Sequence, residues 1–203
     1  MIKTVLILLG FITLLGCHKI CTPSKYACYG GVATIYPDVD SIQLGDTLRF
    51  NTTIPINVKY SQANSSDSSF YNLSGATNIV TDLHVTTPTG INMQEGAVDS
   101  FNFILIKGNI KSNPLIPNAA KTISYLEEGG MYHMSVAMVA KKKGVYCLSI
   151  IDIYQAEKKC DKISVITVMS NPDNHLHYLQ DIYYGGGLIS SIDLTHSYCF
   201  KVY

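Results

Sequence analysis

Short runs of alternating apolar and polar residues follow one another along most of the chain, and this alternation predicts β-strands. Residues 41–50 show the pattern: Ile42 and Leu44 alternate with polar neighbours, a turn follows, and the alternation then resumes. The turn is Gly45-Asp46, where the carboxylate is expected to accept hydrogen bonds from backbone N–H groups. Further strands are predicted at residues 32–36, 79–86, 100–106, 131–140, 145–154, 163–169 and 197–203.

The regular spacing of these strands predicts a mainly β domain, folded as an antiparallel β-sandwich. Residues 145–153 are apolar on both faces near the middle of the run, which is typical of a central strand. They follow residues 131–140 after the loop 141–144, so the two runs are expected to form a hairpin. The loop contains three lysines without arginine or aromatic residues, which favours a solvated tip over a nucleic-acid patch.

One short helix is predicted near the C-terminus. Asp173 or Asn174 is expected to cap its first turn, and the glycines at 185–187 are expected to end it. The residues that would share its apolar face are Leu176, Leu179 and Tyr183.

The first seventeen residues form a separate unit. Lys3 gives a positive start, and residues 5–15 form an apolar run interrupted by Gly10 and Thr13. The run is too short for a bilayer span of about 20 residues and has the layout of a secretory signal. The sequence contains no second apolar run of spanning length.

The end of this run, Leu14-Leu15-Gly16-Cys17, resembles the lipobox of bacterial lipoproteins. In that family the signal peptidase cuts after the residue that matches Gly16, and the thiol that matches Cys17 carries a diacylglyceryl group. The resemblance therefore implies a signal peptide at 1–16 and a lipidated tether at 17–25, and the strand pattern predicts a single β-sandwich domain at 26–203. A terminus with two or more acyl chains would hold the protein stably on a membrane.

Further resemblances concern bacterial surface proteins and lipoproteins of the Bacteroidota. The step Ile42-x-Leu44-Gly45-Asp46-Thr47-Leu48 is similar to one that is common in immunoglobulin-like sandwiches of bacterial surface proteins, and it implies that fold. Surface display in the Bacteroidota is associated with acidic residues after the acylated cysteine, whereas His18, Lys19 and Ile20 stand here. An outer-membrane anchor facing the periplasm is therefore favoured over the cell surface. The triplets 40–42 and 46–48 also resemble the Bacteroidota O-glycosylation pattern, which leaves glycosylation open.

Charge and composition exclude a nucleic-acid binder of the usual kind. Without the signal, 14 basic residues face 15 acidic ones, which gives a formal net charge of −1. Arg49 is the only arginine, so the basic stripe with arginine forks expected of such a protein is missing. The remaining 187 residues suffice for one well-packed domain.

The cysteines support an exported protein but leave their pairing open. With Cys17 acylated, an odd number remains, so at least one thiol is free or pairs between chains. Cys147 lies in the most apolar strand and is expected to stay reduced as a small buried hydrophobe. We expect Cys21 to bond with Cys28, and Cys160 to bond with Cys199, although the sequence alone cannot decide the connectivity.

The candidate binding residues cluster near the predicted helix. Tyr178, Tyr183 and Tyr184 are candidates for a ligand-binding surface, or else form the core face of the helix. His175 and His177 are the only histidine pair: on a strand the two rings could share a metal ion, whereas on a helix they would point apart. We favour the helix and expect neither a metal nor a cofactor.

These observations favour a lipid-anchored envelope protein that serves as a non-catalytic binding or assembly module, with a protein or glycan partner. No GxSxG, HExxH or P-loop motif occurs in the sequence. One alternative is a glycan-binding or adhesin-like surface protein, which requires exposed tyrosine rings on one face. Another is an envelope glycan hydrolase, which requires a cleft with two carboxylates at a defined separation.

Overall fold

The computed structural model describes residues 25–61, 68–90, 93–151, 156–159, 161–171, 173–178 and 196–203. These residues form a mainly β structure of two sheets and one 3-10 turn, η1 (Val98–Ser100). In this part of the chain, no helix has the length and apolar character needed to cross a membrane.

The first sheet has nine strands in the order β11-β12-β3-β1-β15-β14, with β4, β5 and β8 paired beside this path. Its strands are β1 (Lys25–Tyr36), β3 (Thr47–Pro55), β4 (Asn57–Ser61), β5 (Ser68–Asn72), β8 (Phe101–Lys107), β11 (Leu126–Glu128), β12 (Met131–Ala140), β14 (Ala156–Lys158) and β15 (Asp161–Met169).

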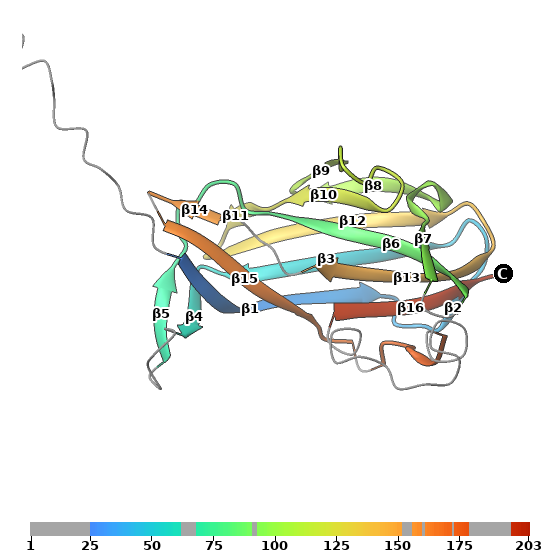
Figure 1. The fold of residues 1–203 in the computed structure, drawn as a ribbon, viewed down its shortest axis with the longest axis horizontal. Helices are drawn as coiled ribbons and strands as arrows, with labels where there is room; N and C mark the ends of the chain where they lie inside the picture. Colours follow the sequence, from blue (N-terminus) through green and yellow to red (C-terminus); the bar gives the residue numbers. More distant parts are fainter. Residues whose placement is uncertain are drawn as a thin grey trace, which may run out of the picture.

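The second sheet has seven strands in the order β2-β16-β13-β6-β10-β9, with β7 paired to β6. Its strands are β2 (Ser41–Ile42), β6 (Val80–Gly90), β7 (Met93–Gly96), β9 (Asn109–Ser112), β10 (Ala120–Ser124), β13 (Gly144–Ile151) and β16 (Ser197–Val202). Together the two sheets make a β-sandwich (Figure 1).

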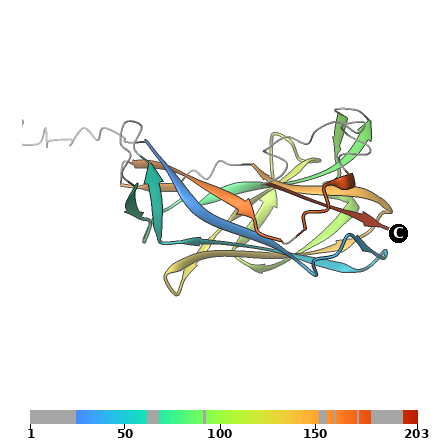
Figure 2. The ribbon, with the colours of Figure 1, turned by 90° about the horizontal axis from the view of Figure 1, so that it is seen from below.

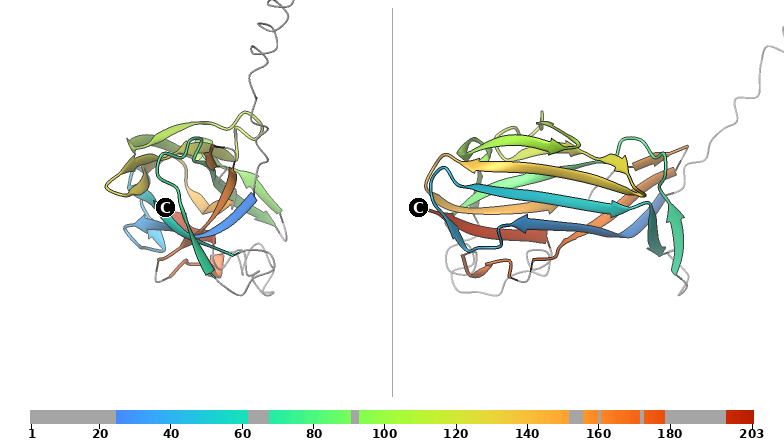
Figure 3. Two further views of the ribbon diagram at one scale, coloured as in Figure 1. Left: turned by 90° about the vertical axis from the view of Figure 1, so that its left-hand side faces the viewer. Right: turned by 180° about the vertical axis from the view of Figure 1, so that it is seen from behind.

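The core lies between the two sheets. The arrangement of the strands is seen from below and end-on in Figures 2 and 3. The burial of β3 alternates along the strand, so that Leu48, Phe50, Thr52 and Ile54 face inward. From the opposite layer, Leu83, Leu148 and Phe200 meet them in one continuous apolar cluster. Burying each such side chain stabilises the fold by about 1.5–3 kcal/mol, so the cluster is the main reason that the layers adhere.

The sandwich is mixed, which corrects the prediction of a purely antiparallel arrangement. Strand β1 pairs with β15 in parallel, from Lys25 opposite Lys162 to Ala33 opposite Met169, and β16 pairs with β2 in parallel. The alternation of apolar and polar residues along a strand shows which face is buried, but the same alternation occurs with parallel and with antiparallel neighbours. The sequence pattern therefore cannot give the direction of pairing, which only the tertiary structure shows.

The predicted hairpin of residues 131–140 and 145–154 is also wrong. Strand β12 pairs with β3, β8 and β11 in the first sheet, whereas β13 pairs with β6 and β16 in the second. Lys141–Lys143 therefore connect the two layers, and the Tyr146 hydroxyl donates a hydrogen bond to the carbonyl of Lys142 at 3.1 Å. The position of β13 between two neighbours confirms that it is a central strand.

The long predicted strands agree with the structure, whereas short ones escaped the sequence pattern. Strands β6, β8, β12, β15 and β16 overlap the runs predicted for them. Strands β4, β5, β9, β10, β11 and β14 have three to five residues and were not predicted. Such lengths are too short for alternation to stand out from neighbouring turns.

The predicted C-terminal helix is not seen in the described residues. Within 173–178, only His177 and Tyr178 have a helical backbone, and residues 179–195 lie outside the described part. His175 has a positive φ of 52°, and Asp173 accepts a hydrogen bond from the His175 N–H at 2.7 Å. The segment therefore begins with an Asx-type turn, which competes with the helix cap expected from the same residue types.

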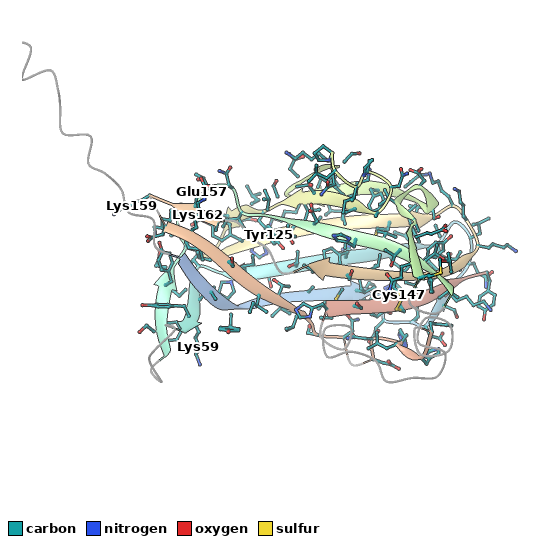
Figure 4. The ribbon with its side chains drawn as sticks, viewed as in Figure 1. Lys59, Tyr125, Cys147, Glu157, Lys159 and Lys162 are labelled. Atoms are coloured by element: carbon teal, nitrogen blue, oxygen red, sulfur yellow. A yellow bond between two sulfur atoms is a disulfide. The ribbon has the colours of Figure 1, made fainter. Side chains whose placement is uncertain are left out.

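A disulfide joins Cys147 of β13 to Cys199 of β16, which corrects the expectation that Cys147 is reduced and that Cys199 bonds with Cys160. The two cysteines are directly opposite in the register of the strands, with a Cα–Cα distance of 4.1 Å (Figure 4). A cross-strand bond of this kind depends on which strands are neighbours, which the sequence did not reveal. Cys21 and Cys160 lie outside the described residues.

Cys28 is buried in the core and has a free thiol, so the expected bond to Cys21 is not formed. Burial raises the pKa of this thiol to about 11, which keeps it protonated and unreactive at neutral pH. The side chain acts as a small core hydrophobe, the role that the sequence had suggested for Cys147.

Replacing Cys147 and Cys199 together by alanine should lower the free energy of unfolding by about 4 kcal/mol, as measured by urea denaturation. The reason is that the bond closes a chain segment with a sequence separation of 52, which restricts the unfolded state. Mass spectrometry of a non-reduced tryptic digest should find the Cys147 and Cys199 peptides linked. A peptide linking Cys160 to Cys199 would contradict the pairing.

Candidate functional site

His175, one of the two histidines singled out in the sequence, is held between two carboxylates. Its Nδ1 lies 3.3 Å from Asp173 Oδ2, and its Nε2 lies 3.4 Å from Asp38 Oδ1. The imidazole is buried, and its ring meets Tyr198 edge-on at a centroid distance of 5.2 Å. The arrangement brings together the segments that follow β1 and β15 and the last strand, β16.

The Tyr198 hydroxyl is the centre of this polar cluster. It accepts a hydrogen bond from the Val39 N–H at 3.0 Å, and it lies 2.9 Å from the Val39 carbonyl oxygen and 3.1 Å from Asp38 Oδ1. Burial, together with the nearby Asp38 carboxylate, raises the pKa of this hydroxyl above its ordinary value. The hydroxyl therefore remains a protonated donor and fixes the 38–40 segment against β16.

This cluster is better suited to holding the chain than to catalysis. His175 and Tyr198 are both covered, so neither presents an open face to a substrate. In the described part of the chain, no three His, Cys, Asp or Glu side chains are grouped so that they could hold a metal ion. His177 is exposed, and its ring lies 6.4 Å from that of His175 at an angle of 80°.

The predicted tyrosine surface is only partly described. Tyr178 is half-buried and, with Leu176, packs against the Cys147–Cys199 disulfide on the outer side of the second sheet. Burial, and to a smaller extent the Asp40 carboxylate, raises the pKa of its hydroxyl. Tyr183 and Tyr184 lie outside the described residues, so the structure leaves their role as a ligand surface untested.

A second polar cluster surrounds the Glu127 carboxylate. It accepts hydrogen bonds from the Ser74 hydroxyl and the Gly75 N–H, both at 2.9 Å, and lies 2.9 Å from the Tyr132 hydroxyl. The bond from Gly75, followed by that from Tyr132, lowers the pKa of Glu127. Burial, followed by the hydrogen bond to Glu127, raises the pKa of Tyr132 to about 12. The Glu127 carboxylate thus holds the loop between β5 and β6 in place by hydrogen bonds.

Beside this cluster is a hollow of about 350 Å³. Residues 76–80 form one side of it, and Ser124, Tyr125 and Tyr132 form the other. Its volume is at the lower end of the range for small-molecule sites, and its lining includes no Asp or Glu. The hollow therefore lacks the paired carboxylates that the hydrolase alternative requires.

The most unusual surface lies along strand β8. Ile104, Leu105 and Ile106 are three consecutive aliphatic residues with exposed fractions of 54%, 43% and 47%. A hollow of about 360 Å³ opens beside them, between β8 and the strands β9 and β10. The residues that line it are Phe101, Asn102, Phe103, Ile110, Lys111, Ser112 and Lys121.

Sequence reasoning missed this surface, although it predicted the strand. A run of Phe103-Ile104-Leu105-Ile106 is equally compatible with a central strand buried on both faces. An edge strand differs from a central strand in having no second strand partner. Because pairing is a property of the fold, the sequence contains no signal for this difference. Polar residues, which carried the sequence-based search for a site, are sparse in this run.

Changing Tyr198 to phenylalanine should lower the free energy of unfolding by about 1–3 kcal/mol, because the Val39 N–H and Asp38 would lose a buried partner. Urea denaturation followed by circular dichroism measures the change. Tyr36→Phe is the matched control, since Tyr36 ends β1, shortly before the 38–40 segment, but is 70% exposed. Equal losses for the two variants would refute the role assigned to the Tyr198 hydroxyl.

Comparisons with known proteins identify no family. No protein-family model matches the chain, and no curated protein matches it either. Among solved structures, the chain is similar to a human F-spondin reeler domain, with 12% identity over 76% of this chain and 95% of that one, and a TM-score of 0.37. It is also similar to a type II cohesin module from the ScaA scaffoldin of Acetivibrio cellulolyticus, with 8% identity over 69% and 95% of the two chains and a TM-score of 0.26.

Proposed function

We propose that this protein is a bacterial envelope lipoprotein, anchored through Cys17, whose β-sandwich is a non-catalytic binding or assembly module. The lipobox-like residues Leu14-Leu15-Gly16-Cys17 support the anchor. Strand β1 begins at Lys25, at the end of the sandwich opposite the C-terminus (Figure 1). The eight residue-to-residue steps from Cys17 to Lys25 can span at most roughly 30 Å, so the anchor would keep the domain close to the membrane.

The observation that carries the binding function is the exposed aliphatic run on β8. Contiguous apolar surface is unfavourable in water, and soluble domains keep it mainly where a partner covers it. Ile104 and Leu105 lie opposite Ala137 and Val136 of β12, so the sheet holds this part of the run in place. A preformed surface is suited to binding because little conformational entropy is lost on association.

The two alternatives have less support. Neither of the hollows described above is lined by a carboxylate, and the oxygens of Glu127 are occupied by Ser74, Gly75 and Tyr132. A glycan hydrolase needs a pair of available carboxylates. For glycan binding, Tyr178 offers only part of its ring because it packs on the disulfide, and the sequence contains no tryptophan.

The finer assignments belong to the same proposal. The step Ile42 to Leu48 supports an immunoglobulin-like sandwich, and its Asp46 carboxylate accepts a hydrogen bond from the Gln43 N–H at 2.8 Å, as expected for this turn. The absence of acidic residues at 18–20 supports an outer-membrane position facing the periplasm.

Metabolic labelling with an alkyne fatty acid tests the anchor. The chain should incorporate the label and partition into detergent, and Cys17→Ala should abolish both because the acylated thiol is lost. Cys21→Ala is the control and should keep the label, since it leaves the lipobox-like motif unchanged. An unlabelled wild-type chain that partitions into buffer would refute the anchor.

A further inference from the structure

We propose that the free edge of β8 binds an extended, acidic segment of a partner protein as an added β-strand. The inference rests on the proposed role as a binding module and names the partner's chemistry. Strand β8 pairs with β12 from Phe101 opposite Ala140 to Lys107 opposite Ser135. Within the described residues it has no strand on its other side, and it lies along the upper margin of the molecule (Figure 1; Figure 3, right).

The backbone of such a strand is a ready template for another chain. An edge strand has a row of N–H and C=O groups that a further strand can pair with. Many binding modules recognise extended peptides in this way, with main-chain hydrogen bonds for affinity and side-chain contacts for specificity. β8 has seven residues, enough for several such bonds.

The side chains on β8 add an apolar contact on both sides of this edge. Ile104 pairs with Ala137 on the outer side of the first sheet, so an added strand would cover it there. Phe101 and Phe103 line the hollow between β8 and β9, into which alternate side chains of the added strand could extend. An added strand would therefore bury apolar surface that is otherwise in water.

Charge decides the chemistry of the partner. Between Ser100 and Leu126 the sequence contains Lys107, Lys111 and Lys121 but no Asp or Glu. Lys107 forms an ion pair with Glu128, whereas Lys111 is exposed on the rim of the hollow. Lys121 donates a hydrogen bond to the Ser112 hydroxyl at 3.1 Å, and its Nζ lies 5.6 Å from the centre of the Phe103 ring.

Asp82 of β6, which lies opposite Thr122 of β10, is not among the residues that line the hollow. It accepts hydrogen bonds from the Thr122 hydroxyl at 2.7 Å and from the Asn113 amide at 2.8 Å. Lys111 and Lys121 line the hollow and no Asp or Glu does, so its rim is positive, and acidic residues on the added strand would complement it. A second copy of this chain on the same edge would bring lysines against lysines, which disfavours self-association through β8.

Fluorescence anisotropy with a labelled peptide of alternating valine and glutamate tests the proposal, using the full chain in detergent. The variant Ile104→Thr/Ile106→Thr should bind at least tenfold more weakly, and threonine keeps the β propensity of the strand. Leu115→Thr is the matched control because Leu115 is 88% exposed but lies in the loop after β9. Its affinity should stay within twofold of the wild type.

Charge and backbone pairing are tested separately. Lys111→Glu should weaken binding about fivefold, whereas Lys142→Glu, at an exposed position in the β12–β13 connection, should not. A probe N-methylated through its central residues should bind at least tenfold more weakly, because it cannot donate main-chain hydrogen bonds. Replacing its glutamates by lysine should have a similar effect.

The proposal would be overturned if the valine–glutamate probe did not bind at concentrations up to 1 mM (about −4 kcal/mol). It would also be overturned if the N-methylated probe bound as tightly as the unmodified one, or if Leu115→Thr lowered the affinity as much as Ile104→Thr/Ile106→Thr. A concentration-dependent dimer that Ile104→Thr/Ile106→Thr abolishes would instead assign the edge to a second copy. The anchor is tested by fatty-acid label at Cys17 and the edge by peptide binding, so either one can fail without affecting the other.

Discussion

Burial of one apolar face of each sheet against the other is the interaction on which the rest of the structure depends. Inward residues of β3 and β12 meet those of β6, β13 and β16 in one continuous cluster. Because side chains alternate along a strand, burying one face leaves the other outside. Stacking the sheets in this way also leaves them open, so the outermost strands keep main-chain groups without a strand partner. The same constraint that makes the core therefore also creates the surface available for binding.

Polar contacts and one disulfide fix the segments that follow β1 and β15, and the last strand, β16, in the second sheet. The Tyr198 hydroxyl holds the Val39 segment, His175 lies between Asp38 and Asp173, and the Cys147–Cys199 bond links neighbouring strands. A buried hydroxyl is costly unless it is partnered, so the hydrogen bonds of Tyr198 specify how the 38–40 segment lies against a core that apolar contacts alone would hold less uniquely. Histidine and carboxylates that resemble a reactive site thus contribute to the architecture.

The binding role that we propose depends on the architecture through the edge of β8. A strand that is paired on one side is rigid enough to present a fixed row of backbone groups, and its exposed isoleucines add apolar area to them. Natural sheets protect such edges with charge. In our proposal the lysines near β8 disfavour pairing with a second positive edge and favour a strand that carries negative charge.

The sequence by itself determined the β class, the positions of the long strands and the central character of β13, because alternation reports how much of each strand is buried. It also determined the turn at Asp46, whose carboxylate accepts the bond expected from local geometry. The partners of each strand came only from the tertiary structure: the parallel β1–β15 pair, the separation of β12 from β13, the Cys147–Cys199 bond and the free edge of β8. Pairing is decided by contacts between residues far apart in the chain, and a local pattern of apolar residues contains no record of which distant strand will lie beside it.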